Sequence, residues 1–445
     1  MSQKAKSVDS PLLTAENIKK HFPVETGIIS RFLGDEEFVR AVDGVDIELR
    51  EGETVGVVGE SGCGKTTLGR TVARLYEPSD GSIHFDDQEI TDVSGDRLKK
   101  LRKNIQVIFQ DPMSSLNPRK TVGEIVAKPL EIHDLASGDE KRERVIELFE
   151  EVGLQESHLD RYPHEFSGGQ RQRVGIARAL AVEPKLIIAD EPVSALDVSV
   201  QAQIINLMKR LQAEYGISYL FIAHDLSVVK HISDRVAVMY LGKIAEKGST
   251  EEIFENPQHP YTRALMNSIP RVDKKRSRRD ILLEGTPPSP SNPPEGCPFH
   301  SRCPEFIGDE CVDREPELEQ VSGDSGSEDS SHVVACHWQE KSVEERQEQD
   351  PFNRERRSRA ASREIPAGSR EITHCTADIT RWKSSSMFGL RDPSCSAFFS
   401  HRETTTRSCS GSTQTTFEPL PMAAKLLSGA LGQRARSSLS HQRYP

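Results

Sequence analysis

Two groups of residues in the 445-residue chain have the types and spacing that phosphate chemistry needs. The first is the segment GESGCGKTT, residues 59–67, which fits the phosphate-binding loop pattern between a predicted strand and a predicted helix. Its backbone N–H groups turn inward on a β-phosphate, and the positive end of the following helix adds to them. Lys65 reaches the β- and γ-phosphates, and the Thr66 hydroxyl is a ligand for Mg²⁺. The predicted nucleotide contacts in this loop are Gly59, Glu60, Ser61, Gly62, Cys63, Gly64, Lys65, Thr66 and Thr67.

The second group is a pair of adjacent acids, Asp190 and Glu191, which follow an apolar run. A strand that ends at Asp190 places this carboxylate at the edge of a sheet, beside Mg²⁺, while Glu191 polarises the attacking water. Isolated acids of this kind are more often surface groups. Behind a phosphate loop and a buried strand, the functional interpretation is favoured.

A third segment, FSGGQRQR at residues 166–173, opens a predicted helix that continues through residues 176–180. Ser167 is a good N-cap, and the glycines that follow expose free N–H groups, which form an anion site. One chain therefore carries two phosphate-binding sites, the phosphate loop and this helix start, but needs only one of these two devices for its own nucleotide. A head-to-tail dimer explains both, because the second device of each chain then covers the γ-phosphate held by the other. The alternative is a helix cap and nothing more.

The elements that must position these residues follow from the apolar pattern. Alternating polar and apolar residues at 45–49 predict a strand with one solvated face, and residues 66–75 and 97–160 are mostly helical in character. Apolar runs separated by helical stretches predict an α/β fold with a parallel sheet covered on both faces. Three runs have the length of buried strands: 54–58, 185–190 and 218–223.

Charge and hydropathy indicate the cellular compartment in which the protein works. No run approaches the ~18 apolar residues that span a bilayer, and residues 1–20 lack a signal-peptide core. We therefore expect a cytosolic protein that reaches a membrane only through a partner. The net charge of −11 divides into −17 for residues 1–340 and +6 for residues 341–445. The acidic body argues against nucleic-acid binding; it suits a high-salt cytoplasm or an ordinary acidic bacterial protein.

The order of the motifs resembles that of ABC ATPases. Segments 59–67, 167–170, 187–191 and 194–197, followed by His224, are similar to the Walker A, signature, Walker B, D-loop and switch-histidine elements. The resemblance implies a P-loop NTPase (RecA-like) α/β core, an antiparallel β subdomain and a helical subdomain. It also implies hydrolysis of ATP with Mg²⁺ as cofactor. The signature contacts are then Ser167, Gly168, Gly169 and Gln170.

The resemblance also implies roles for single residues. Gln110 is similar to the Q-loop glutamine, which senses Mg²⁺ and the γ-phosphate and links them to the helical subdomain. His224 contacts the γ-phosphate and holds the attacking water with Glu191, and Asp197 communicates across the dimer. The implied catalytic residues are therefore Glu191, His224 and Gln110, and the Mg²⁺ ligands are Thr66, Gln110 and Asp190.

One implied contact departs from the family pattern. Phe22 is the candidate for the aromatic ring that stacks on adenine, usually a tyrosine in the family, and Phe38 is the alternative.

Longer segments narrow the resemblance to the dipeptide and oligopeptide importer ATPases. The segments QDPMSSLNPR (110–119), RYPHEFSGG (161–169) and DEPVSALDVS (190–199) are similar to that family, and NPQHPYTRAL (256–265) is similar to its C-terminal signature. Phe166 and the pair Val193-Ser194 resemble its second, F-type ATPase. Importers of nickel or other small solutes are the alternative. A soluble non-transport ABC ATPase is disfavoured, because this chain has one cassette and no long coiled-coil insertion.

An F-type assignment implies partners. They are a D-type ATPase in a heterodimer, two transmembrane permease subunits and, indirectly, an extracellular peptide-binding protein. The chain is then peripheral, at the cytoplasmic face of the cell membrane.

The chain divides by composition. We expect an ATPase domain at 10–270 with a helical subdomain at about 111–180, a basic and proline-rich linker at 271–294, and a C-terminal cysteine module of the oligopeptide-transporter type at 295–338. Residues 341–445 hold 17 Ser and 14 Arg and few apolar clusters, so they cannot offset their ordering entropy. We expect a disordered tail, which is either the product of a shifted reading frame or a basic arm for anionic lipids.

Four cysteines in the module are candidate metal ligands: Cys297, Cys303, Cys311 and Cys336. Stable disulfides are disfavoured in a reducing cytosol. Four cysteines so close together in the sequence therefore suggest a structural metal site. Structural zinc sites favour closely spaced CxxC pairs, whereas the gaps here are five, seven and twenty-four residues. The family resemblance implies a [4Fe–4S] cluster; zinc and unligated thiols are the alternatives. Cys63 is a filler in the phosphate loop, and Cys375, Cys395 and Cys409 have no partners at sensible spacing.

Overall fold

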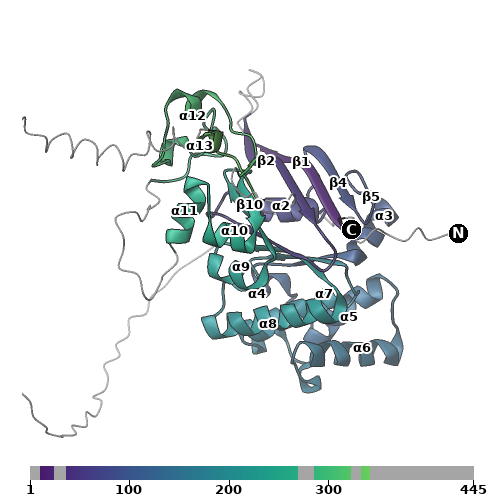
Figure 1. Cartoon of the computed structure of the whole chain (residues 1–445). Helices are drawn as coiled ribbons and strands as arrows, with labels where there is room; N and C mark the ends of the chain where they lie inside the picture. Colours follow the sequence, from purple (N-terminus) through teal and green to yellow (C-terminus); the bar gives the residue numbers. More distant parts are fainter. Residues whose placement is uncertain (1–10, 25–36, 269–284, 322–331, 341–445) are drawn as a thin grey trace, which may run out of the picture. The chain divides into compact units, whose positions relative to one another are not determined.

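A computed structural model describes residues 11–24, 37–268, 285–321 and 332–340. All of them belong to one compact unit, residues 1–367 (Figure 1), and the second unit, residues 368–445, lies outside the described residues. The predicted tail and most of the predicted linker are therefore outside the described residues as well.

The central sheet has eight strands in the order β11-β12-β10-β9-β3-β8-β7-β6. Five neighbours run parallel: β9 (Arg235–Tyr240), β3 (Thr54–Val58), β8 (Ser218–Ala223), β7 (Leu186–Asp190) and β6 (Ile105–Ile108). Every residue of β3, β7 and β8 is buried, which explains why these strands are continuous apolar runs. The predicted α/β fold with a covered parallel sheet is confirmed.

Alternate residues of the parallel strands pack into two separate apolar clusters. Leu186 and Ile188 belong to one cluster, and Ile187 and Ala189 to the other, because successive strand side chains point to opposite faces. The first cluster contains α2 (Lys65–Val72) and residues of β1 and β2. The second contains α7 (Gly168–Leu180), α8 (Val198–Tyr215), α9 (Leu226–Ile232) and several residues from 297–311.

A second, antiparallel sheet covers one face in the order β2-β1-β4-β5. Its strands are β1 (Leu13–Pro23), β2 (Phe38–Leu49), β4 (Asp80–Phe85) and β5 (Gln88–Glu89). In β2, Val45, Ile47 and Leu49 are buried while the residues between them are exposed. The predicted alternation at 45–49 and the predicted antiparallel β subdomain are confirmed.

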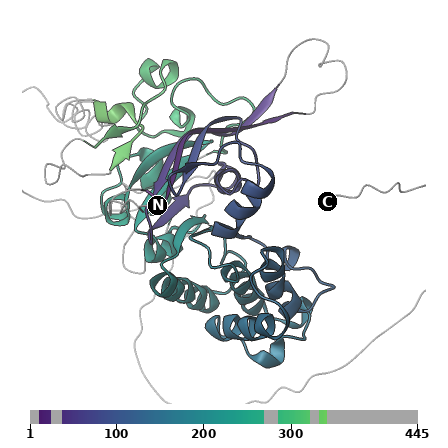
Figure 2. The same ribbon diagram turned by 90° about the vertical axis from the view of Figure 1, so that its right-hand side faces the viewer.

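Helices dominate the stretch between β5 and β7. They are α3 (Gly95–Asn104), α4 (Pro112–Ser115), α5 (Val122–Ile132), α6 (Gly138–Glu151) and α7, with 3-10 turns at Glu156–His158 and Pro163–Glu165. In Figures 1 and 2, α5, α6 and α7 lie together, away from the antiparallel sheet. The prediction that 97–160 is mostly helical missed β6, because its four residues directly follow the charged helix α3. The predicted helix 66–75 ends at Val72, since Arg74 has a left-handed conformation with φ 54°.

C-terminal residues extend the central sheet. β10 (Lys243–Ser249) pairs antiparallel with β9, β12 (Val333–Val334) with β10, and β11 (Glu319–Gln320) with β12. The remaining helices are α10 (Thr250–Glu255), α11 (Pro260–Asn267), α12 (Asp309–Asp313) and α13 (His337–Glu340), with a 3-10 turn, η3, at His300–Arg302. Among the helices that the structure describes, none is both long and apolar enough to cross a bilayer.

Candidate nucleotide site

The phosphate loop leaves β3 and enters α2 at Lys65. Gly64, the residue before the helix, has φ 107°, a conformation that favours glycine. A Cβ atom at Gly64 would lie 2.0 Å from the carbonyl oxygen of Ala41, and one at Gly59 would lie 2.1 Å from that of Met239. The loop therefore packs too tightly between β2 and β9 for any other residue at these two positions.

Lys65 lies inside this loop, with 5% of the residue exposed. Its ammonium group donates hydrogen bonds to the carbonyl oxygens of Gly59 at 2.8 Å and Glu60 at 2.9 Å. Burial raises the pKa of the neighbouring Cys63 thiol, which agrees with its predicted role as an inert filler. A lysine held in this way places a positive charge where the phosphate groups of a nucleotide lie.

Thr66 and Asp190 meet across the sheet edge. The Thr66 hydroxyl donates to Oδ1 of Asp190 at 2.8 Å. Asp190 is 2% exposed, and its Oδ2 has no hydrogen-bond partner; Arg70 approaches it to 3.7 Å. Burial raises the pKa of this carboxyl group. A buried carboxylate oxygen without a hydrogen bond, next to a hydroxyl, fits a hard cation such as Mg²⁺.

The three residues predicted as catalytic converge at the same edge. Gln110 follows β6, Glu191 follows β7 and His224 follows β8, so parallel strands deliver all three to one side of the sheet. The amide nitrogen Nε2 of Gln110 donates to Oε2 of Glu191 at 2.8 Å, and Nδ1 of His224 lies 3.2 Å from the same oxygen. Glu191 has a left-handed backbone with φ 48°, and its backbone N–H donates to the carbonyl oxygen of Ile222 at 2.9 Å.

A cavity joins the phosphate loop to this group. Its lining includes Ser61, Gly62, Gly64, Lys65, Thr66, Thr67, Gln110 and Glu191. It also includes Val39, Ala41 and Pro290, which the sequence did not identify. The carbonyl oxygen of Pro290 accepts a hydrogen bond from Arg40 at 3.1 Å, a pairing between segments 250 positions apart that no local motif reveals.

Phe22, the predicted adenine contact, is not among the residues that line this cavity. Its ring packs edge-on against Tyr76, with ring centres 5.6 Å apart. Its partner across the β1–β2 ladder, Val39, does line the cavity, and the alternative Phe38 is the next residue along. Phe22 as the adenine contact therefore remains a prediction.

The signature segment does not line the cavity at the phosphate loop of its own chain. Ser167 caps α7 as predicted, accepting from the Gln170 backbone at 3.4 Å. A Cβ at Gly169 would lie 2.5 Å from Val200 of α8, and one at Gly168 would lie 3.1 Å from Leu196, so the signature packs beside the D-loop. The cavity lining contains none of 167–170 and not Asp197 either. Next to Asp197, Val198 is 81% exposed.

The four candidate metal ligands form no disulfide. Burial raises the pKa of Cys297 to about 11, that of Cys303 to about 12 and that of Cys336 still further. Cys297 and Cys311 are buried, and Cys303 and Cys336 are half-buried. Within the described residues, however, no three His, Cys, Asp or Glu side chains already form a metal-ligand group.

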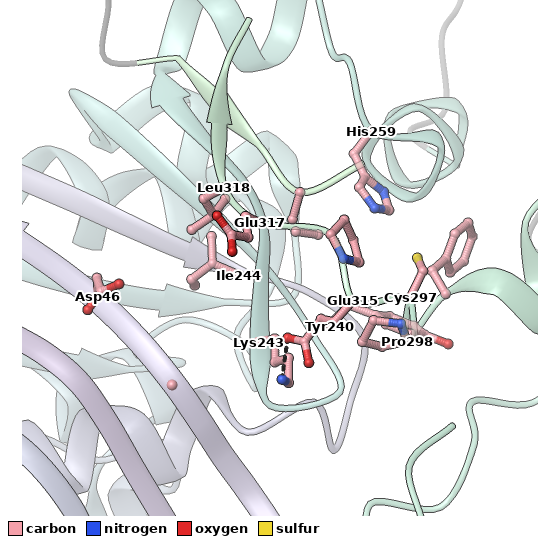
Figure 3. Close-up of a pocket in the computed structure, with 15 residues that line it drawn as sticks. Asp46, Tyr240, Lys243, Ile244, His259, Cys297, Pro298, Glu315, Glu317 and Leu318 are labelled. Carbon is pink, nitrogen blue, oxygen red and sulfur yellow. Dashed lines mark hydrogen bonds and ion pairs between the residues drawn. The ribbon is translucent and has the colours of Figure 1, made fainter. Parts of the chain in front are cut away.

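Cys297 also lines a cavity of about 520 Å³ between β10 and the cysteine module (Figure 3). Tyr240, His259 and Glu315 are among the other lining residues. Cys375, Cys395 and Cys409 lie outside the described residues.

Two family descriptions match the chain. "ABC transporter" matches residues 42–194, and "Oligopeptide/dipeptide transporter, C-terminal region" matches residues 245–311. The chain is 54% identical over 329 residues to the oligopeptide transport ATP-binding protein AppF of Bacillus subtilis (strain 168), which covers 73% of this chain and 97% of that protein. This chain belongs to the ATP-binding proteins of oligopeptide and dipeptide ABC transporters.

Other members of this peptide-transporter family are similar over the same length. The dipeptide transport ATP-binding protein DppF of Escherichia coli (strain K12) is 49% identical over 336 residues, 76% of this chain and 97% of that one. The oligopeptide transport ATP-binding protein OppF of Salmonella typhimurium (strain LT2) is 52% identical over 328 residues, 73% of this chain and 95% of that one. The family predicted from the motifs is confirmed, and with it an ABC-transporter ATPase.

Proposed function

We propose that this chain hydrolyses ATP to drive the import of di- and oligopeptides through a membrane permease. The observation that carries the proposal is the convergence of Gln110, Glu191 and His224 beside an intact phosphate loop. Several relatives with about half of their residues identical are named for oligopeptide or dipeptide transport, which supports peptides as the solute.

In the proposed reaction, the loop N–H groups and Lys65 bind the β- and γ-phosphates. Thr66 and Asp190 would hold Mg²⁺, which would neutralise charge on the phosphate oxygens. Glu191 orients and polarises a water molecule for in-line attack on the γ-phosphorus, and the bond to the bridging oxygen breaks to release ADP and phosphate. Gln110 and His224 fix the Glu191 carboxylate, since both lie against one of its oxygens.

We further propose that the site is completed by a second ATPase. The signature residues Ser167–Gln170 and Asp197 are not among the residues that line the cavity at the phosphate loop of their own chain, which supports their use across a head-to-tail dimer. The exposed Val198 beside Asp197 suits such an interface, because a largely exposed aliphatic side chain gains from burial. The proposed partner is a D-type ATPase. Within this chain, Phe22 is the proposed contact for the adenine ring.

The helical side of the molecule is the proposed contact with two permease subunits. Four of its large apolar residues are between 37% and 46% exposed: Met113, Ile132, Leu135 and Tyr162. Large apolar side chains that are partly exposed to water are candidates for a partner contact. The chain is then peripheral at the cytoplasmic face of the membrane, and a peptide-binding protein outside reaches it only through the permease.

The proposed division of the chain follows the elements. Residues 10–270 form the ATPase domain, in which about 111–180 is the helical subdomain, and 295–338 form a cysteine module. We infer that this module binds a [4Fe–4S] cluster through Cys297, Cys303, Cys311 and Cys336, since four soft sulfur donors suit iron–sulfur chemistry or zinc. All four thiols are outside disulfides and at least half-buried, and binding a cluster requires their side chains to come together.

Transport in a reconstituted system tests the proposed function. The chain, its D-type partner and two permeases are placed in proteoliposomes with the binding protein. We expect uptake of labelled di- and oligopeptides and peptide-stimulated ATPase activity only when both ATPases are present. Full activity with this chain as the sole ATPase would contradict the heterodimer. Uptake of nickel but not peptide would contradict the peptide assignment.

A further inference from the structure

Glu60, the second residue of the phosphate loop, is held on three sides. Its backbone N–H donates to the hydroxyl of Tyr261 at 2.8 Å, and its carbonyl oxygen accepts from Lys65 at 2.9 Å. Its carboxylate accepts two hydrogen bonds from Arg302, Nη1 to Oε2 at 2.7 Å and Nη2 to Oε1 at 3.0 Å. Parallel two-point contacts of this kind combine strength with a fixed geometry.

Arg302 comes from the cysteine module, in the short turn η3 between Cys297 and Cys303. Its side chain is only 5% exposed, and its guanidinium group also donates to the Tyr240 hydroxyl at 3.3 Å and the Gly285 carbonyl at 3.2 Å. The guanidinium group is thus engaged in several directions. A buried arginine with this many partners holds a single position, and the loop residue bound to it is held with it.

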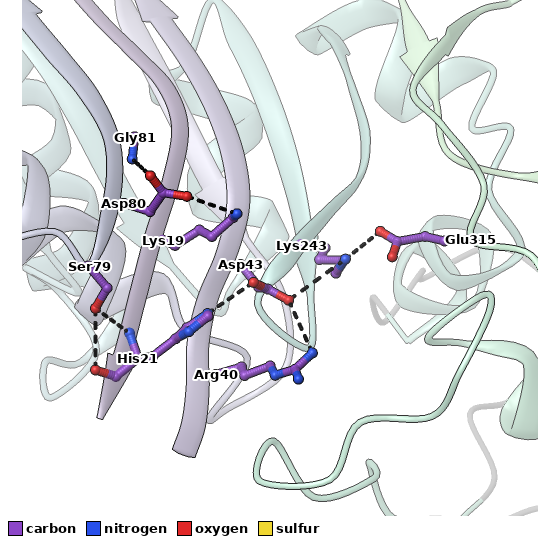
Figure 4. A network of polar contacts seen from close by, with 9 residues as sticks. All are labelled: Lys19, His21, Arg40, Asp43, Ser79, Asp80, Gly81, Lys243 and Glu315. Atoms are coloured by element: carbon purple, nitrogen blue, oxygen red, sulfur yellow. Dashed lines mark hydrogen bonds and ion pairs between the residues drawn. The ribbon is translucent and has the colours of Figure 1, made fainter. Parts of the chain in front are cut away.

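The module has its own attachments to the ATPase core, so Arg302 is not needed to tether it. Glu315 pairs with Lys243, which also lies 3.8 Å from Asp43 in the network that crosses into the antiparallel sheet (Figure 4). Glu305 pairs with Arg263 of α11. Buried apolar packing adds to these contacts: the Phe299 ring lies 5.3 Å from Tyr240 and 5.4 Å from Tyr261, measured between ring centres.

We infer that Arg302 is a positioning residue through which the cysteine module sets the affinity of the phosphate loop for nucleotide. Two physical effects act together. The ion pair between Arg302 and Glu60 keeps the phosphate loop in one conformation. Nucleotide binding then does not have to select that conformation from several. Arg302 also pairs the Glu60 carboxylate with a positive charge, so that this loop residue adds less negative charge to a loop that binds an anion.

This inference rests on the proposed ATP binding and deepens it. A contact that only tethered the module would stabilise the fold and leave affinity unchanged. A contact that positions the loop changes affinity even where the fold remains intact. Apparent affinity falls in proportion to the fraction of molecules in the competent conformation.

Calorimetric titration of the full chain with the Mg²⁺ complex of a non-hydrolysable ATP analogue tests the inference. If the competent fraction falls to about a tenth, Arg302→Met raises Kd about tenfold. Arg302→Lys keeps the charge but loses the two-point geometry, so about a threefold rise is expected. The control Arg263→Met removes another module–core ion pair that does not touch the loop, and its Kd should stay within about twofold of the wild type.

A double variant examines the pairing itself. Because Arg302→Met and Glu60→Gln break one contact, their combination should bind no more weakly than Arg302→Met alone. Additive losses, approaching about a hundredfold, would mean that the two side chains act separately and would overturn the inference. So would an unchanged Kd in Arg302→Met with a lowered Tm, or an equal loss in Arg263→Met.

Steady-state kinetics in the assembled transporter give a second readout. Arg302→Lys should raise KM for ATP and leave kcat near the wild-type value. At saturating ATP the nucleotide site is occupied, and the variant then hydrolyses ATP at the normal rate. Should Arg302→Met not fold, the kinetics and the titration of Arg302→Lys still decide the matter: an unchanged KM and Kd in Arg302→Lys would reject the inference. A wild-type chain that binds no nucleotide would instead reject the proposed function.

Discussion

The nucleotide site and the cysteine module are built in opposite ways. Each predicted catalytic residue follows directly, or within two positions, the end of a parallel strand, and the sheet brings these ends together. Among the residues of 295–338 that the structure describes, 295–321 and 332–338, no helix or strand is longer than five residues, and the four cysteines are spread over 40 positions. A motif attached to a strand end has a predictable place in space, whereas the place of a cysteine in irregular chain depends on long-range packing.

The largest expected effect tests the regular site. Glu191→Gln should lower ATP turnover in the assembled transporter at least about a hundredfold, because the group that polarises water is lost. Binding of ATP should persist, since Lys65 and the loop remain. Phosphate release and nucleotide retention are measured together, with the exposed Glu255→Gln of α10 as control. Normal turnover in Glu191→Gln would remove this residue from its proposed role.

The second prediction tests the irregular module. Protein purified without oxygen should be brown and contain about four iron and four sulfide per chain. Serine at Cys297, Cys303, Cys311 or Cys336 should remove the colour and the iron, while Cys63→Ser, in the phosphate loop, should keep both. One zinc per chain in a colourless protein would favour zinc, and no metal at all would leave unligated thiols.

A smaller effect concerns the charge buried at Asp190. Burial raises the pKa of this carboxyl group in the folded protein above its value of about 3.9 in the unfolded chain. The unfolded state then binds fewer protons, so this group lowers stability as pH rises from about 4 through the folded pKa. Nucleotide-free Asp190→Asn should therefore have a higher Tm than the wild type at neutral pH, with the difference vanishing in acid.

Adding Mg²⁺ and ATP should reverse the order of the Tm values of the wild type and Asp190→Asn. Mg²⁺ and ATP should stabilise the wild type much more than Asp190→Asn, because the variant loses a charged metal ligand. Thermal unfolding across pH 4–8, with and without Mg²⁺ and ATP, measures both effects. A nucleotide-free variant less stable than the wild type at neutral pH would show that the carboxylate is not a source of instability.

The smallest effect is expected for residues 341–445. Ending the chain after Glu340 should leave ATPase activity and peptide uptake within about twofold of the full-length values, since the proposed site lies elsewhere. Co-sedimentation with membranes is measured on the same samples. Loss of membrane association or uptake would reject the shifted-frame explanation and favour the basic arm.

Most of the correct predictions about the fold and the site came from short local patterns in the sequence. The apolar runs that became β3, β7 and β8 predicted both the sheet and the meeting of Thr66 with Asp190. Strand β6 was missed because four residues beside a charged helix give too short a signal. Pro290 and Arg302 were missed because each reaches the site from a distant segment through tertiary packing alone.

The bridge between Glu60 and Arg302 joins residues 242 positions apart, and this has a consequence for biosynthesis. A ribosome adds about 5–20 residues per second, so roughly 10–50 s separate the synthesis of the two residues. During that interval the phosphate loop of the nascent chain is present without the arginine that holds it. The residues of the phosphate loop are therefore made well before Arg302, the side chain that pairs with Glu60 in the folded protein.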